Sequence, residues 1–283
     1  MIAVLGGLGA AAAWAISTLC SSRSSRILDP PSVVAWMMLV GLAVCAPLAA
    51  AGGVPARLNS ASAGWLVLSG AGNVGGLMIT YRALRIGQVA LVAPLVSTEG
   101  AVAAIIAVGA GEALRPAVGA ALGLAALGLC VAAIPRGGLE RARRTRHLES
   151  VLLAAAAALA FGTSLYATAR AGAELPSAWV VLAARAVGTG ALLVPLALAG
   201  RLRLARSAVP LIVASGLCEV AGFFAYTAGA RHGIAIAAVL ASQVGALAAV
   251  GGYLLFGERL GRVQLAGVTT VLVAVALISG LQA

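Results

Sequence analysis

Three ionisable side chains stand well inside long apolar stretches of the sequence: Glu99, Arg185 and Glu219. A charged group at the centre of a membrane carries a free-energy penalty of about 2.5–3.5 kcal/mol, so such a residue normally faces a cavity or a charged partner. A carboxyl group that is shielded from water can hold either a proton or a substrate, which is what a proton-coupled antiporter needs. Glu99 and Glu219 are therefore predicted to couple protons to transport. The alternative interpretation is a static ion pair with Arg185 that joins two helices.

Polar and aromatic residues at similar depth extend this set. Thr98 is adjacent to Glu99, and Asn73 and Gln243 stand in the middle of other apolar stretches. Two ionisable and two neutral polar groups suit a site for a polar or zwitterionic solute. The aromatic candidates have an alternative role, because Tyr and Trp near the ends of membrane helices are usually interfacial anchors. The predicted substrate-binding residues are Trp14, Asn73, Thr98, Tyr166, Arg185, Phe223, Tyr226 and Gln243.

The composition decides which solvent surrounds these residues. Hydrophobic residues make up 62% of the 283 positions and charged residues only 10%, whereas a soluble domain has about 25% charged residues. The chain is therefore predicted to be a multi-pass integral protein of the plasma membrane, in contact with lipid. Its net charge of +11 comes from arginines in short connectors, and no basic stripe indicates a nucleic-acid partner. Isolated cysteines and two connector histidines give no basis for a metal site or a cofactor.

Ten apolar stretches are long enough for membrane helices, which need about 20 residues each. Fourteen of the 19 arginines fall in connectors on one side of these stretches and four on the other. By the positive-inside rule the arginine-rich side is cytoplasmic and both termini lie outside. The predicted spans are residues 1–20, 32–51, 62–81, 88–110, 116–135, 151–170, 177–199, 208–230, 234–256 and 262–281.

A Gly-Glu-x-Leu motif occurs twice, and its glutamates, Glu112 and Glu258, are 146 positions apart. Water or the N-terminus of a following helix is expected to stabilise both carboxylates. Each copy of the surrounding pattern holds five spans, so the second copy enters the membrane in the opposite orientation. The predicted fold is an all-α membrane protein with ten transmembrane helices in two inverted five-helix repeats. The predicted divisions are the repeats 1–135 and 151–283 and a basic connector at 136–150.

The order of these motifs resembles the EamA-type, ten-span members of the drug/metabolite transporter superfamily. Members usually have an Arg in the second span of each half; Arg185 supplies it in the second half, and the first half has none. The resemblance implies a secondary carrier, often an exporter of amino acids or other small metabolites. It also implies cytoplasmic termini, against the arginine count. It rests on Trp14, "DPPS" before span two, "LPS" before span seven, Tyr81, Tyr226, both Gly-Glu-x-Leu motifs and Gly267.

Together these patterns predict a transporter and not an enzyme. The expected activity is export of a small metabolite, such as an amino acid, by alternating access in exchange for protons. A lipid-intermediate flippase of the same fold, with a lateral opening, is one alternative. A membrane-embedded enzyme is a weaker alternative, because it would need clustered nucleophiles, metal ligands or acid pairs.

Overall fold

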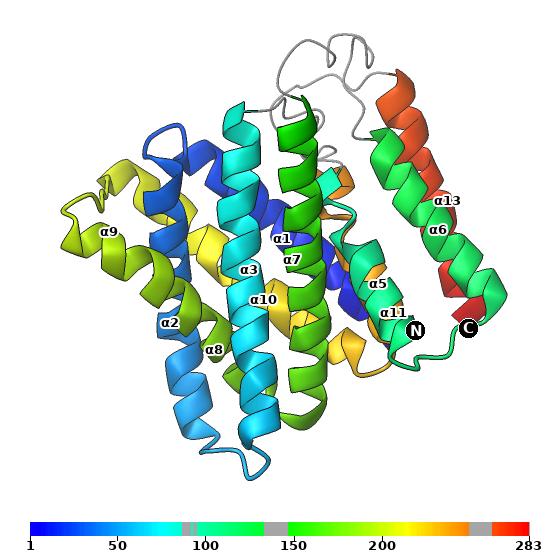
Figure 1. Cartoon of the computed structure of the whole chain (residues 1–283), viewed down its shortest axis with the longest axis horizontal. Helices are drawn as coiled ribbons and strands as arrows, with labels where there is room; N and C mark the ends of the chain where they lie inside the picture. Colours follow the sequence, from blue (N-terminus) through cyan, green and yellow to red (C-terminus); the bar gives the residue numbers. More distant parts are fainter. Residues whose placement is uncertain (87–91, 93–94, 133–146, 249–261, 283) are drawn as a thin grey trace.

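A computed structural model describes residues 1–86, 92, 95–132, 147–248 and 262–282 of the chain. Over these residues the protein is helical, without a strand (Figure 1). Six helical stretches of the described chain are long and apolar enough to cross a membrane. The elements are α1 (Ile2–Ser24), α2 (Pro30–Ala51), α3 (Ser60–Ile86), α5 (Glu99–Gly109), α6 (Pro116–Ala132), α7 (His147–Glu174), α8 (Ser177–Gly188), η2 (Thr189–Leu193), α9 (Val194–Leu198), η3 (Arg206–Ala208), α10 (Val209–Ala230), α11 (Ile234–Ala241) and α13 (Arg262–Gln282).

Local sequence signals begin the early helices. Asp29 caps α2, since its Oδ2 accepts a hydrogen bond from the Ser32 backbone N–H at 3.1 Å, and Pro30 occupies the first helical position, where a missing N–H is harmless. Before α3, Asn59 and Ser62 exchange hydrogen bonds between side chain and backbone N–H, both at 2.9 Å. Such reciprocal bonds satisfy N–H groups that a helix start leaves unpaired. The helix starts therefore lie close to the predicted span boundaries.

Two predicted spans are interrupted. The sequence predicted a continuous helix over 234–256, but α11 ends at Ala241, and a turn at Ser242 and Gln243 precedes a further helical segment, residues 244–248. Within the described part of the predicted span 88–110, a turn at Ser97 and Thr98 precedes α5. The two turns are 145 positions apart and have the same hydrogen bonding, with Gln243 N–H donating to Leu240 O and Thr98 N–H to Leu95 O, each at 3.2 Å.

Side chains compensate for these interruptions. Ser242 Oγ and Gln243 Nε2 both donate to the carbonyl oxygen of Val239 at 2.9 Å, and Thr98 Oγ1 donates to that of Leu95 at 2.6 Å. A helix that breaks inside a membrane must have its freed backbone groups satisfied by protein. The polar residues that the sequence analysis assigned to substrate binding, Thr98 and Gln243, thus serve the backbone at the two breaks.

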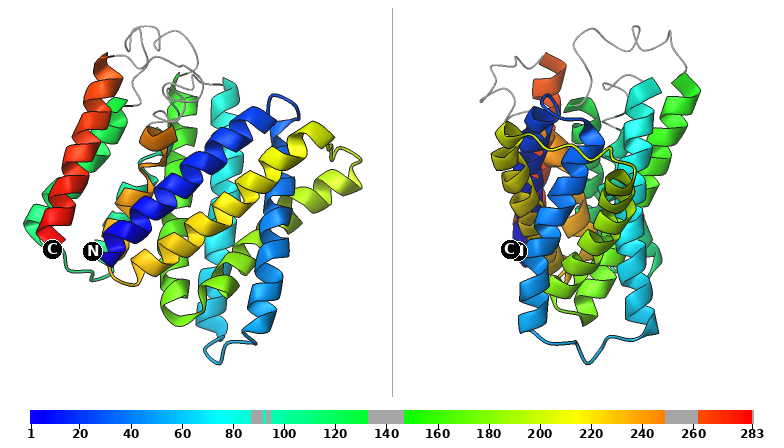
Figure 2. Two further views of the ribbon diagram at one scale, coloured as in Figure 1. Left: turned by 180° about the vertical axis from the view of Figure 1, so that it is seen from behind. Right: turned by 90° about the vertical axis from the view of Figure 1, so that its left-hand side faces the viewer.

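The helices pack in pairs that exchange between the two halves of the chain. We match the five helices of the first half in order with those of the second: α1 with α7, α2 with α8, α3 with α10, α5 with α11 and α6 with α13. Under this matching, the α1–α10 pair corresponds to the α7–α3 pair, and both pairs are extensively packed. The same operation turns α1–α11 into α7–α5 and α2–α10 into α8–α3, which also pack together. Matched helices run in opposite directions in Figures 1 and 2.

Hydroxyl contacts repeat this exchange. Ser215 Oγ on α10 lies 2.9 Å from Ser17 Oγ and 2.7 Å from Ser21 Oγ on α1. Ser69 on α3 meets two residues of α7 at the same spacing, with its Oγ 2.6 Å from Thr168 Oγ1 and its carbonyl oxygen accepting from Ser164 Oγ at 2.7 Å. Residues i and i+4 lie on one helix face. The α1–α10 and α3–α7 pairs therefore each have an equivalent polar contact, and the two contacts lie at opposite ends of the molecule.

The two ends of the bundle differ in charge. One end, called here the arginine-rich end, contains the connector between α1 and α2, the connector between α9 and α10, and the start of α13. The other contains both chain termini and is called the terminal end (Figures 1 and 2). Among the described residues, Arg23, Arg26, Arg82, Arg201, Arg203, Arg206 and Arg262 lie at the arginine-rich end and Arg57, Arg115, Arg170 and Arg231 at the terminal end.

Candidate functional site

A cavity of about 410 Å³ lies between α1, α2, α3, α7, α10, the start of α5 and residues 244–248. It does not extend before Trp14 in α1, beyond Leu165 in α7 or beyond Phe223 in α10. It therefore reaches from the middle of the bundle toward the arginine-rich end only. Five predicted site residues line it: Trp14, Asn73, Glu99, Glu219 and Phe223.

Arg185 lies behind this wall and neutralises one of the two acids. Its Nη2 is 3.6 Å from Glu219 Oε1, which forms an ion pair slightly too long for a hydrogen bond. The guanidinium also lies 4.7 Å from the centre of the Phe223 ring, and Nη1 is 3.0 Å from Met38 Sδ. Arg185 is 0% exposed, whereas the Glu219 side chain keeps 17% exposure to the cavity. Gly41 leaves room for the arginine, since a Cβ there would lie 2.8 Å from Arg185 Cδ.

Glu99 has a different environment. It is the first residue of α5 and lines the cavity. Within the described part of the chain its carboxylate has neither an ion pair nor a hydrogen bond. The positive end of the helix dipole favours a negative charge at this position, but no side-chain cation balances it there. Of the two cavity acids, Glu99 is thus the one without a charged partner among the described residues.

Aromatic rings close the cavity toward the terminal end. Trp14 packs edge-on against Phe223, with ring centres 5.1 Å apart, and its Nε1 donates to the Glu219 carbonyl oxygen at 3.3 Å. Tyr226 lies one layer deeper, 6.2 Å from the Trp14 ring centre. It is fully buried, and its hydroxyl donates to the carbonyl oxygen of Leu165 at 2.9 Å. The hydroxyl ties α10 to α7 below the cavity floor.

The other predicted site residues also lie outside the wall. Tyr166 packs edge-on against Trp65, with ring centres 5.8 Å apart. Gln243 is buried at its helix break, and its Oε1 has no hydrogen-bond partner among the described residues. The structure thus gathers five of the predicted residues around the cavity and leaves Thr98, Tyr166, Arg185, Tyr226 and Gln243 outside its wall.

The sequence analysis missed three polar residues of α1 that line the cavity. Ser17, Thr18 and Ser21 line the cavity together with Trp14. They follow Trp14 by three, four and seven positions, which is the spacing of residues on one helix face. Once Trp14 was chosen as a site residue, this periodicity would have predicted its neighbours.

A second hollow, about 480 Å³, lies at the terminal end around Glu112 and several arginines. The Glu112 carboxylate accepts hydrogen bonds from the backbone N–H groups of Ile234 at 3.1 Å and Ala235 at 3.2 Å. It therefore caps α11 of the other half, whereas the sequence analysis expected water or the N-terminus of a following helix, which would be α6. Its counterpart Glu258 lies outside the described residues. This hollow contains none of the predicted site residues, so we place the candidate site in the smaller, central cavity.

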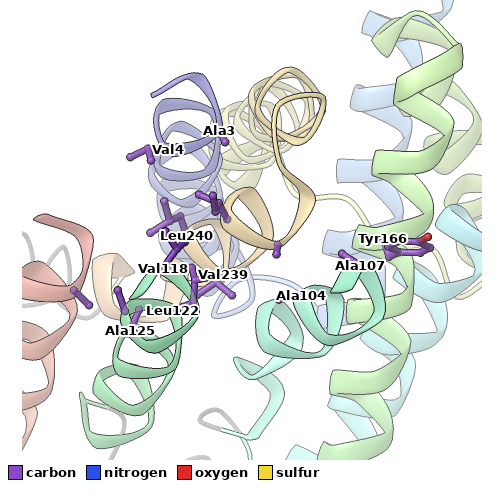
Figure 3. Packing of buried hydrophobic residues seen from close by; sticks show 14 residues of the cluster. Ala3, Val4, Ala104, Ala107, Val118, Leu122, Ala125, Tyr166, Val239 and Leu240 are labelled. Atoms are coloured by element: carbon purple, nitrogen blue, oxygen red, sulfur yellow. The ribbon is translucent and has the colours of Figure 1, made fainter. Parts of the chain in front are cut away.

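Apolar packing fills the bundle between the cavity and this hollow. Figure 3 shows Val239 and Leu240 of α11 beside Val118 of α6, with Val4 of α1 nearby. Tyr166 of α7 belongs to the same buried cluster. The cluster joins α11 to five other helices, α1, α5, α6, α7 and α13. This apolar layer separates the central cavity from the hollow at the terminal end.

A bundle of apolar helices with interrupted spans and acids in a central cavity is typical of membrane transporters. The EamA-like transporter family matches residues 1–134 and 148–280. The chain belongs to this family, and it is a multi-pass membrane transporter of the drug/metabolite transporter superfamily.

Comparison with solved structures supports the fold. One of 28 matching chains, described only as "Crystal structure of protein", is 21% identical and superposes with a TM-score of 0.78. The match covers 99% of this chain and 96% of that chain. No curated protein matches significantly.

Proposed function

We propose that the protein exports a small metabolite across the plasma membrane by alternating access, in exchange for protons. The observation that carries this proposal is the presence of Glu99 and Glu219 in the wall of one cavity that extends toward one end of the bundle only. A carboxylate in such a cavity holds either a proton or a solute, and this competition couples the two fluxes. Glu99 and Glu219 are the proton-coupling residues in this proposal.

The transporter is proposed to consist of ten membrane helices in two inverted repeats, 1–135 and 151–283, with 136–150 as a connector. Three features support this architecture: the exchanged helix pairs, the antiparallel course of matched helices, and the helix breaks 145 positions apart. The two successive matches to the family agree with it. In a transporter with inverted repeats, the contacts that close one end can break while the equivalent contacts form at the other end.

The arginine-rich end is proposed to face the cytoplasm, in keeping with the positive-inside rule. The solute then enters the cavity from the cytoplasm while Glu99 is deprotonated. After the cavity closes at this end and opens at the terminal end, protons from outside displace the solute. The predicted residues that lie outside the wall, including Gln243 and Tyr226, are candidates for solute contacts in that second state.

Counterflow into proteoliposomes tests the proposal. A panel of metabolites is measured with and without a pH gradient, for the wild type and for Glu99→Gln and Glu219→Gln. Both variants are expected to lose the pH-driven flux, and Glu219→Gln is also expected to lower stability, because it leaves the buried Arg185 without its counterion. Glu174→Gln is the matched control, because Glu174 is an exposed acid at the end of α7. Unchanged pH-driven transport in both cavity variants would rule out their coupling role.

A further inference from the structure

The charges around the cavity are unequal. Among the described residues that line it, Glu99 and Glu219 are the ionisable ones, and none is Arg or His. Arg185 is separated from the cavity, fully buried between Glu219, Phe223 and Met38. Among the described residues of the wall, a solute therefore meets carboxylates directly and no guanidinium.

The ion pair removes most of one negative charge and leaves the other. Glu219 has Arg185 at 3.6 Å, while Glu99 has no partner within the described chain. A buried ion without a partner is strongly unfavourable, so a carboxylate in such a position takes up a cation or a proton. A solute with a protonated amine supplies that cation. A carboxylate or phosphate on the solute would instead be repelled, and the described part of the wall offers no positive group to pair with it.

The remainder of the wall suits an apolar body. Trp14, Phe161 and Phe223 present aromatic rings, and Met37 and Leu77 add apolar surface. Aromatic faces also attract cations, most strongly when water is excluded. The hydroxyls of Ser17 and Ser21 are engaged with Ser215 on the neighbouring helix. The wall thus offers one unpaired anion within a largely apolar and aromatic surface.

We propose that the transported solute is an amine with an aromatic or aliphatic body and without a carboxylate. Glu99 binds its ammonium group, and the body packs against Trp14, Phe161 and Phe223. The inference rests on the proposed function and narrows it, since amino acids become poorer substrates than the corresponding amines. A proton on Glu99 competes with the ammonium group, so acidification weakens binding.

Four probes with one shared phenyl group test the inference on the purified protein in detergent. They are 2-phenylethylamine, phenylalanine, 3-phenylpropionate and 2-phenylethanol, titrated by calorimetry. The amine is expected to bind at least about tenfold more tightly than the zwitterion and the anion, the ratio expected for one charge-assisted contact. This ranking is measured on the wild type, so it does not depend on any variant folding.

The variant Glu99→Gln then separates the contribution of the Glu99 charge to binding from that of the shape of the site. It is expected to lose about tenfold or more in affinity for the amine and to bind the alcohol as before; Glu174→Gln is expected to leave all affinities unchanged. Equal binding of the zwitterion or the anion, an unaffected amine in Glu99→Gln, or no amine binding to the wild type would overturn the inference. Counterflow distinguishes a failure of this inference from a failure of the proposed function. If the protein transports only solutes without an amine, the substrate class is wrong but the transport function stands. If it binds the amine without transporting it, the transport function is wrong but the binding site stands.

Discussion

Two regions of this bundle are built from the same helices, yet the region around the central cavity is open and the apolar layer between this cavity and the terminal end is packed. Glycines serve different purposes in the two regions. At the terminal end they admit neighbouring backbone: a Cβ on Gly6 of α1 would lie 2.5 Å from Gly229 Cα of α10, and one on Gly7 would lie 2.7 Å from the Ala237 carbonyl oxygen of α11. Close approach of backbones through small residues is how membrane helices associate tightly.

Around the cavity, glycines make room for large side chains instead. Gly41 accommodates Arg185, and Gly222 accommodates Trp14. The same residue type thus allows close backbone contacts in one region and makes room for large side chains in the other. In the proposed alternating access, backbones that touch could close an end without a separate lid.

The largest loss of stability is expected at the buried ion pair next to the central cavity. Arg185→Leu leaves Glu219 without its partner in a buried position, and breaking a buried pair costs about 3–5 kcal/mol. Thermal unfolding in detergent measures this loss. The double variant Arg185→Leu with Glu219→Leu is expected to recover part of the stability, because no unpaired charge then remains. A single variant as stable as the wild type would mean that the pair contributes nothing to the fold.

A methyl group placed in the packed region tests the backbone contact directly. Gly6→Ala is expected to destabilise the protein by about 1–3 kcal/mol through overpacking. Gly9→Ala in the same helix is the matched control, since its Cβ would lie at an ordinary 3.5 Å from Ala225 Cβ, and alanine favours the helix by about 0.5–1 kcal/mol. Opposite signs of the two changes in unfolding free energy are expected; equal signs would refute the close contact.

The cap on α11 is expected to bias the closed state of the terminal end. Glu112→Gln weakens the carboxylate contacts with Ile234 and Ala235 N–H, at a cost of about 0.5–2 kcal/mol. We therefore expect faster labelling of Ala237→Cys by a polar thiol reagent added at the terminal end, in a background without the native cysteines. Ala237 is fully buried in this structure. Glu174→Gln, at the same end, should leave the labelling rate unchanged; an unchanged rate in Glu112→Gln as well would show that the cap does not hold this end closed.

The sequence was sufficient to select those residues of the cavity wall whose position depends on depth in the membrane. Trp14, Asn73 and Glu99 stand near the middle of apolar stretches, and helices that cross one bilayer bring such positions to one level. The family was also evident, because its motifs are local. The arginine bias agrees with the two ends of the described bundle.

What depends on contacts between distant helices could not be predicted. The hydroxyl of Tyr226 is bound to the backbone of Leu165, 61 positions away, and this removes an apparent cavity residue from the wall. Thr98 and Gln243 look like solute ligands in a span, because a polar residue that serves a helix break carries the same sequence signal as one that serves a site. Arg185 and Glu219 were compatible with both a static pair and a transport role, and their distance alone decides that they are paired.

The smallest expected effect compares the equivalent hydroxyl contacts at the two ends. Ser69→Ala removes the bond with Thr168, and Ser215→Ala removes the contacts with Ser17 and Ser21. Hydrogen bonds between membrane helices contribute about 0.6 kcal/mol each on average, so both variants should lose stability by amounts of this order, with Ser215→Ala losing somewhat more. If the halves are true repeats, the two changes act on matched helix pairs, and their effects on unfolding free energy should add in the double variant. If Ser69→Ala lost several times more stability than Ser215→Ala, the two hydroxyl contacts would not be equivalent, and the contact on α3 would contribute more to the fold than its counterpart on α10.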